Sequence, residues 1–239
     1  MPRGRIDALA SLVVEARFGA HFLHRHAGRL SLLFAGLLLP LWGFAVLADE
    51  VRDGAAFLYD EPLLRLGQSL ARDGFDRVFL FFSHAGYAYG VVPVDIALVL
   101  LLALRRQLRE GLFAGVAIIG SALLNLAAKQ AFGRERPSLW ESITPESTLS
   151  FPSGHAMGSM TLALVLLLLA WPTQWRWPAL ALAAVFVPMV GLSRVYLGVH
   201  YPSDILAGWA AASIWVVGIY LMVFGPRRHP WQAPGLRDF

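Results

Sequence analysis

Three short strings of the sequence combine side chains that could hold a phosphate group and attack it. They are residues 129–137 (KQAFGRERP), 152–155 (PSGH) and 193–204 (SRVYLGVHYPSD). Together they supply cations, two histidines, the carboxylate of Asp204 and a Ser-Gly turn. Each string lies near the end of an apolar segment, so the arrangement of these segments determines whether the strings can meet.

The first string carries Lys129 and Arg136, which lie about two helical turns apart along the sequence. Gly133 and Pro137 predict that the helix ends before Arg136, since a residue that precedes proline avoids the helical region. In either conformation, a point charge and a bidentate guanidinium are available to bind a phosphate monoester. Interfacial cations also commonly extend toward lipid headgroups, so this string alone is a weak indication.

The second string is typical of a loop that leads into a helix. The Ser153 side chain can cap that helix, and Gly154 allows the backbone to approach a ligand closely. Free N–H groups at a helix N-terminus favour an anion. His155 would then lie in the first turn, where an imidazole can act as general acid toward a leaving oxygen. The alternative is an ordinary helix start with an interfacial histidine.

The third string is the most specific, because it adds Arg194 and places His200 and Asp204 at a fixed spacing. Pro202 is favourable at the first position of a helix, which predicts that Asp204 lies in the first turn and can reach back to His200. A carboxylate that holds one imidazole nitrogen fixes the tautomer and makes the other nitrogen a better nucleophile. The alternative is that Asp204 only caps the helix.

The composition predicts an all-α integral membrane protein. The 239 residues are 57% hydrophobic and only 15% charged, with a mean hydropathy of +0.57, whereas a soluble domain carries about 25% charged residues. A large soluble helical core would require polar faces that the apolar segments mostly lack. Runs of about 20 apolar residues can cross a bilayer as helices. We expect six transmembrane helices in one bundle, at residues 30–48, 79–104 (or starting nearer residue 85), 112–131, 155–171, 178–195 and 205–224.

The charge pattern favours a membrane over nucleic acid as the partner. The net charge is +4, but the basic residues lie between apolar spans and not along one face. The absence of cysteine excludes a disulfide framework and a thiolate metal site.

Positive residues accumulate on the cytoplasmic side of membrane proteins, which predicts that both termini are cytoplasmic. In that orientation the outer segments hold Arg52, Arg65, Arg72, Arg77 and Arg134 besides the motif cations. The inner segments hold twelve arginines: Arg3, Arg5, Arg17, Arg25, Arg29, Arg105, Arg106, Arg109, Arg176, Arg227, Arg228 and Arg237.

The order of the spans brings the three strings to one side of the membrane. The first string ends the third span, the second begins the fourth, and the third joins the fifth to the sixth. Because successive spans alternate in direction, these four helix ends meet at one interface, which the arginine count places outside.

We expect a single membrane domain over residues 1–239. Residues 1–29 form a cytoplasmic N-terminal segment, and the first span remains uncleaved although residues 46–48 could pass for a signal-peptidase site. Residues 49–77 form the only sizeable outer connection, and their pattern is compatible with an amphipathic helix on the bilayer surface or with a polar loop that carries a few buried anchors.

The three strings closely resemble the signature of the type 2 phosphatidic acid phosphatase family, whose superfamily includes vanadium haloperoxidases. The pattern K-x6-RP, PSGH and SR-x5-H-x3-D is matched without a departure, over a motif-bearing core at about residues 111–224. The resemblance implies that His200 is the nucleophile that forms a phosphohistidine, that Asp204 orients it and that His155 protonates the leaving group. It implies no metal and no cofactor, and it assigns phosphate binding to Lys129, Arg136, Ser153, Gly154 and Arg194.

The function that follows is a lipid phosphatase of a bacterial cytoplasmic membrane, with the active site facing outward. The resemblance suggests undecaprenyl diphosphate, phosphatidylglycerophosphate or phosphatidic acid as substrate and does not choose among them. Two alternatives remain open: a haloperoxidase-like enzyme that uses vanadate, and a non-catalytic binder or transporter of lipid phosphates. Binding alone would need only the cations, so the two histidines and Asp204 favour an enzyme.

Three further polar residues lie in or near the apolar segments. Asp95 is ionisable within the second span, and such residues are either functional or satisfied inside the bundle. Asn125 lies one turn before Lys129 and could hold the lysine in place. His84 lies near the outer end of the second span, but no spacing ties it to the strings.

Overall fold

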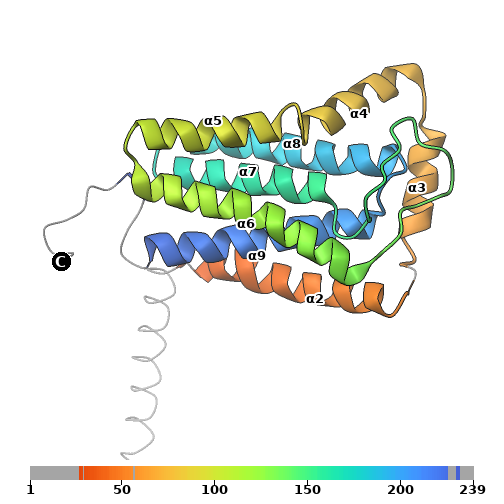
Figure 1. Cartoon of the computed structure of the whole chain (residues 1–239), viewed down its shortest axis with the longest axis horizontal. Coiled ribbons are helices and arrows are strands. Elements are labelled where there is room, and N and C mark those ends of the chain that lie inside the picture. The colour runs from red at the N-terminus through yellow and green to blue at the C-terminus, as the bar shows by residue number, and fades with distance from the viewer. Residues whose placement is uncertain (1–26, 29, 56, 226–229, 232–239) are drawn as a thin grey trace, which may run out of the picture.

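The described residues form an antiparallel bundle of helices (Figure 1). The structure, a computed structural model, describes residues 27–28, 30–55, 57–225 and 230–231, and no strand occurs within them. Most of the expected cytoplasmic segment 1–29 lies outside this range. The elements are a π-helical turn, η1 (Phe34–Leu38), followed by α2 (Leu39–Arg52), α3 (Asp60–Ser69), α4 (Asp73–Ala85), α5 (Val91–Leu104), α6 (Leu108–Phe132), α7 (Gly154–Ala170), α8 (Arg176–Tyr196) and α9 (Pro202–Phe224).

Among the residues that the structure describes, four helices are long and apolar enough to cross a membrane: Leu30–Arg52, Leu108–Phe132, Arg176–Tyr196 and Pro202–Phe224. Helices α5 and α7 are shorter apolar helices. On α6, the side chains of Leu112, Ile119, Leu123 and Leu126 are each more than half exposed and share one helix face. A continuous apolar stripe of this kind is unfavourable in water and favourable against lipid, so it supports an integral membrane protein.

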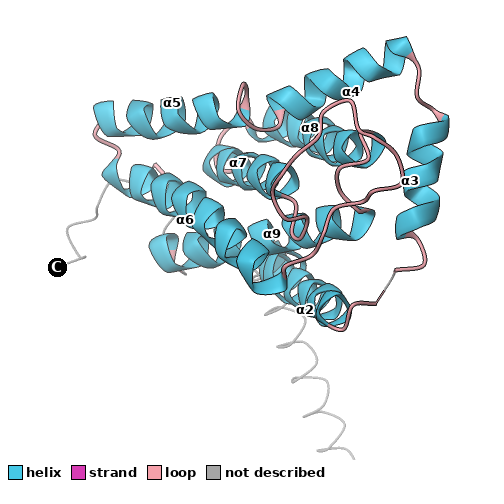
Figure 2. Ribbon diagram, turned by 45° about the vertical axis from the view of Figure 1, so that its right-hand side comes forward, coloured by secondary structure: helices cyan, strands magenta, loops and turns pink. Residues whose placement is uncertain are grey.

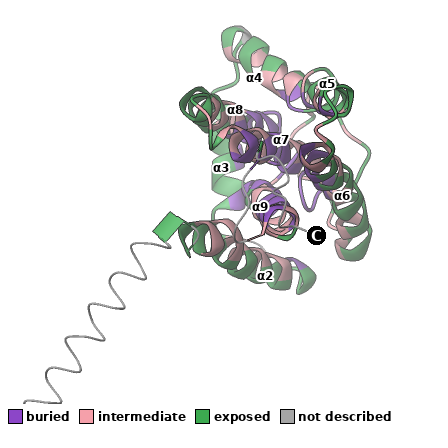
Figure 3. Ribbon diagram, turned by 90° about the vertical axis from the view of Figure 1, so that its left-hand side faces the viewer, coloured by how far each residue is buried: buried purple, intermediate pink, exposed green. Residues whose placement is uncertain are grey.

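Burial is concentrated on α7 and α9, which lie at the centre of the bundle, while α2, α4, α5 and α6 form the outside (Figure 3). The central pair can pack closely because Gly208 of α9 lies against the start of α7. A Cβ at position 208 would lie 2.8 Å from the carbonyl oxygen of Ser153. The two central helices are therefore in close contact where the PSGH string begins α7.

The expected continuous span at residues 79–104 is wrong. Helix α4 ends at Ala85, α5 begins at Val91, and the two lie end to end along one edge of the bundle (Figure 1). The glycines at the break explain it, since a Cβ on Gly86 would lie 2.5 Å from a methyl group of Val190, and one on Gly90 would lie 2.2 Å from the carbonyl oxygen of Ala85. The second apolar stretch is two helices joined by a tight turn.

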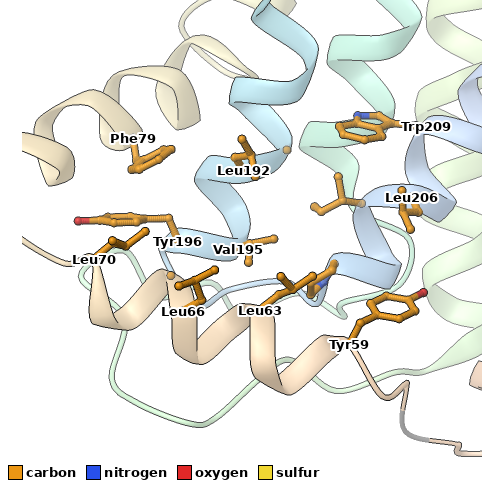
Figure 4. Close-up of a pocket in the computed structure, with 14 residues that line it drawn as sticks. Tyr59, Leu63, Leu66, Leu70, Phe79, Leu192, Val195, Tyr196, Leu206 and Trp209 are labelled. Carbon is orange, nitrogen blue, oxygen red and sulfur yellow. The ribbon is translucent and has the colours of Figure 1, made fainter.

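The outer connection contains an amphipathic helix, α3, which packs on the ends of α8 and α9 (Figure 4). Gly67 allows the close approach, because a Cβ there would lie 3.3 Å from Cα of Tyr196. Leu63, Leu66 and Leu70 line an apolar cavity of about 320 Å³ between α3 and these helices. A helix forms in this connection, and its position on the bilayer surface stays a prediction.

One end of the bundle contains the end of α6, the start of α7, the end of α8 and the start of α9. The connection between α6 and α7 lies across these helix ends (Figure 2). Helix α6 ends at Gly133, whose left-handed φ of 62° favours glycine. Helix α7 begins after Ser153, whose hydroxyl oxygen accepts the N–H of Ala156 at 3.4 Å, and α9 begins at Pro202. The local stop and start signals of the three strings therefore act where the sequence predicts.

Candidate active site

His200 lies in the short connection between α8 and α9 and is almost fully buried, with 1% of its side chain exposed. Its Nδ1 is 3.3 Å from Oδ2 of Asp204, and its Nε2 is 3.0 Å from Nη1 of Arg136. A guanidinium can only donate, so Nε2 must accept and the imidazole proton belongs on Nδ1, facing the carboxylate. Burial lowers the pKa of His200, although Asp204 acts in the opposite direction. The imidazole is thus neutral near pH 7, with Nε2 unprotonated and accepting from Arg136.

Asp204 has several donors around it and is completely buried. Its Oδ2 accepts the hydroxyl of Ser150 at 2.5 Å and the backbone N–H of Tyr201 at 2.9 Å, in addition to lying beside His200. The carboxylate therefore caps α9 and contacts the imidazole at the same time, so Asp204 does more than cap the helix. Fixed donors of this kind restrict both the carboxylate and the ring that it faces.

The second oxygen of Asp204 is bound by Arg134, a residue that the sequence analysis did not assign to the site. Nη1 of Arg134 lies 2.6 Å from Oδ1 of Asp204 and donates to Oγ of Ser203 at 2.7 Å, while Nη2 donates to Asp60 at 2.9 Å. Asp60, at the start of α3, also accepts the N–H of Ser203 at 2.9 Å. These bonds tie α3 to the Asp204 carboxylate.

Arg136 and Arg194 lie on opposite sides of a third carboxylate, Glu146. Nη2 of Arg136 is 2.6 Å from Oε2 of Glu146, and Nη2 of Arg194 donates to Oε1. Burial by itself would raise the pKa of Glu146, but the two guanidiniums outweigh it and lower that pKa. Burial likewise lowers the pKa of Arg136, with Glu146 acting against that shift. Glu146 is ionised near pH 7.

Backbone carbonyl oxygens position Arg136, and a side chain of α4 positions Arg194. Arg136 donates to the carbonyl oxygens of Thr148 at 2.5 Å and Val199 at 2.6 Å. Arg194, in the last turn of α8, also donates to the hydroxyl of Ser83 on α4. Helix α4 therefore contributes to the site although no string predicted it.

Lys129, Ser153 and Gly154 lie at the facing ends of α6 and α7. The Lys129 ammonium donates to the carbonyl oxygen of Leu149, two positions before the turn that contains Pro152. A Cβ on Gly154 would lie 3.1 Å from Oδ1 of Asn125, so glycine allows α7 to start close against α6. Asn125 donates to the carbonyl oxygen of Pro152 at 3.1 Å, so its amide holds the turn that precedes α7.

His155 lies in the first turn of α7, within reach of the charges of Arg194, Arg136 and Lys129. Its ring centroid is 5.1 Å from that of Tyr87, in the turn between α4 and α5. The eight residues of the three strings are thus brought to one end of the bundle. His84 is exposed and contacts the ring of Tyr89, with centroids 5.7 Å apart.

Asp95 is buried in α5, and its Oδ1 has no hydrogen-bond partner among the residues that the structure describes. None of the site contacts above involves it.

The residues that the sequence analysis missed are Glu146, Ser150, Arg134, Asp60 and Ser83. Arg134 lies within the first string, two positions before Arg136, and its charge was available as a signal. The other four carry no local pattern, since single Ser, Asp and Glu residues are common in loops and at helix ends.

The sequence is similar to those of several known proteins. The sequence profile described as the PAP2 superfamily matches residues 110–228. Phosphatidylglycerophosphatase B of Bacillus subtilis is 29% identical over 175 residues, which cover 70% of this chain and 84% of that protein. The undecaprenyl-diphosphatase of Sulfolobus acidocaldarius is 33% identical over 144 residues, which cover 58% of this chain and 66% of that protein.

A solved structure shares the fold. The crystal structure of a transmembrane PAP2 type phosphatidylglycerolphosphate phosphatase from Bacillus subtilis superposes with a TM-score of 0.69 at 24% sequence identity, covering 80% of this chain and 98% of that one. The profile match falls on the helices that carry all three strings, and the superposition extends over most of the bundle. The chain therefore belongs to the PAP2 superfamily, as its three strings predict.

Proposed function

We propose that this chain is an integral membrane phosphatase that releases a terminal phosphate from a lipid phosphate through a phosphohistidine intermediate. The observation that carries the proposal is the orientation of His200, whose Nδ1 faces Asp204 while Nε2 faces the Arg136 guanidinium. Membership of the PAP2 superfamily and the names of the phosphatases that it resembles support a phosphatase that acts on lipid phosphates.

In the proposed reaction, Lys129, Arg136 and Arg194 bind the phosphate oxygens, and free N–H groups at the start of α7 assist them. Nε2 of His200 attacks phosphorus as the bond to the lipid oxygen breaks, and His155 gives that oxygen a proton. A water molecule then attacks the phosphohistidine, His155 takes its proton, and inorganic phosphate leaves. Phosphoryl transfer requires chiefly positioning and charge stabilisation, which the three cations supply.

The substrate class follows from the setting. The site lies at the ends of apolar helices, where a phosphate could be reached while its hydrocarbon tail stays in the bilayer. Phosphatidylglycerophosphate and undecaprenyl diphosphate, named by the relatives, and phosphatidic acid are the candidates. The experiment that tests the function measures inorganic phosphate released by the purified protein from these three lipids. Hydrolysis of none of them would contradict the proposal.

The first prediction concerns the cofactor requirement. We expect turnover to continue in EDTA and orthovanadate to inhibit competitively, because the three cations supply the charge that Mg²⁺ supplies in other phosphoryl transfer enzymes. Vanadate can adopt a five-coordinate geometry that resembles the transfer state, and such analogues bind tightly. Steady-state kinetics with and without EDTA checks this. Activity that disappears in EDTA and returns with Mg²⁺ would contradict the mechanism.

The second prediction concerns topology. We propose one membrane domain with six spans, formed by Leu30–Arg52, the interrupted pair α4–α5, and α6, α7, α8 and α9. Both termini are cytoplasmic, and the active site faces the periplasm of a bacterial inner membrane. The chain has no native cysteine, so Glu141→Cys and His229→Cys can each be labelled alone. We expect a membrane-impermeant maleimide to label position 141 from outside and position 229 only after permeabilisation. Labelling of both positions from the same side would refute the six-span topology.

A further inference from the structure

The carboxylate of Glu146 lies between the two arginines of the proposed phosphate site. Its Oε2 is 2.6 Å from Nη2 of Arg136, and its Oε1 accepts a hydrogen bond from Nη2 of Arg194. Arg136 is in turn 3.0 Å from Nε2 of His200, the proposed nucleophile. One side chain therefore uses donors of both guanidiniums, next to the atom that would attack phosphorus.

Arg194 has a donor that this carboxylate does not use. Nε of Arg194 is buried and has no hydrogen-bond partner in the described part of the chain. Leaving a buried donor unpaired is unfavourable. A terminal phosphate presents three oxygens instead of two and carries a charge of about −1.5 to −2 near neutral pH. A phosphate could thus replace Glu146 and also satisfy a donor that the carboxylate leaves unpaired.

We infer that Glu146 is an internal competitor for phosphate, which leaves the two arginines when substrate binds and returns when product departs. The inference rests on the proposed function in taking these arginines as the phosphate site. An anion that binds both arginines must displace the Glu146 carboxylate. The apparent dissociation constant of that anion is therefore its intrinsic constant divided by the fraction of protein in which Glu146 has left the arginines. Inorganic phosphate meets the same competition, which favours its release.

The position of Glu146 allows the exchange. Its side chain is 28% exposed, whereas that of Arg194 is 1% exposed. It belongs to the connection between α6 and α7, which is anchored on either side: Ser142 donates to the carbonyl oxygen of Leu197 at 2.6 Å, and Ser150 donates to Asp204 at 2.5 Å. The carboxylate can turn toward solvent while these anchors and the arginines stay in place.

The third prediction tests this role. We expect Glu146→Gln to lower the inhibition constant of inorganic phosphate against p-nitrophenyl phosphate hydrolysis on the order of tenfold, because a charge-assisted pair is lost. Glu146→Ala should lower it at least as far, since a glutamine oxygen can still accept from an arginine. Thermal stabilisation of the purified protein by phosphate should rank the three proteins in the same order without any turnover.

Glu141→Gln is the matched control, because Glu141 is exposed on the same connection and the variant makes the same change in net charge. Its inhibition constant should stay within about twofold of wild type, as for other surface substitutions. An unchanged constant in Glu146→Gln would overturn the inference. An increased inhibition constant in Glu146→Gln would also overturn it, because it would mean that Glu146 orients the arginines. Failure of phosphate to raise the thermal stability of any of the proteins would overturn it as well. The proposed function is tested separately, by phosphate release from lipid phosphates by the wild-type protein. Thermal stabilisation by phosphate tests the role of Glu146 even if the protein hydrolyses none of them.

Discussion

Replacing His200 by alanine is expected to abolish both steady-state turnover and the covalent intermediate. The proposed reaction forms its only covalent bond to the protein at Nε2 of His200, which is the nitrogen that faces Arg136. Loss of a catalytic nucleophile in other enzymes costs on the order of 10⁶-fold in kcat. Rapid mixing of the wild-type protein with ³²P-labelled lipid phosphate, followed by an alkaline quench that preserves phosphohistidine, should trap a labelled protein, and the variant should give none.

His84→Ala provides the control for this experiment. It makes the same substitution at a histidine that is exposed and contacts Tyr89 instead of the proposed nucleophile. The control should keep its phosphoenzyme and its turnover. Labelled protein trapped from His200→Ala would show that another residue is the nucleophile.

Replacing His155 by alanine is expected to slow hydrolysis by an amount that depends on the leaving group. A lipid alkoxide is a strong base and needs a proton as it departs, whereas p-nitrophenolate hardly needs one. General acid catalysis is typically worth about 10²–10⁴-fold, so the variant should lose that much activity on phosphatidic acid and far less on p-nitrophenyl phosphate. The measurement is the ratio of kcat/KM between variant and wild type for each substrate.

A polar reference variant strengthens this comparison. His155→Gln keeps a polar side chain of similar length in the first turn of α7 but cannot transfer a proton, so it should reproduce the dependence on the leaving group. Equal losses on both substrates would contradict the assignment of His155 as general acid. Such losses would mean that His155 only binds the phosphate or supports the start of α7.

The sequence by itself predicted the family, a helical membrane protein and the ends of the helices that carry the site. These features depend on signals that act over a few residues. Gly133 ends α6 through a left-handed φ, Ser153 caps α7 through its own hydroxyl, and Pro202 opens α9. The contact between His200 and Asp204 was likewise predictable from their spacing. A residue in the first turn of a helix can reach the segment just before that helix.

The break between α4 and α5 depended on the tertiary structure. The sequence showed an apolar stretch, and hydropathy does not distinguish one helix from two placed end to end. Gly86 packs against Val190, which is more than a hundred positions away along the sequence, so only the packed bundle reveals why glycine is needed there.

The surroundings of the candidate site were also decided only by the tertiary structure. Asp60 reaches Arg134 and Ser203 from α3, Ser83 reaches Arg194 from α4, and Glu146 reaches two arginines from a connection without a helix. Each of these residues is an ordinary polar type with no spacing that marks it, and its partner lies on a different element. Local patterns determine where a helix begins and ends, but the identity of a charge's partner is set by which elements the folded chain brings together.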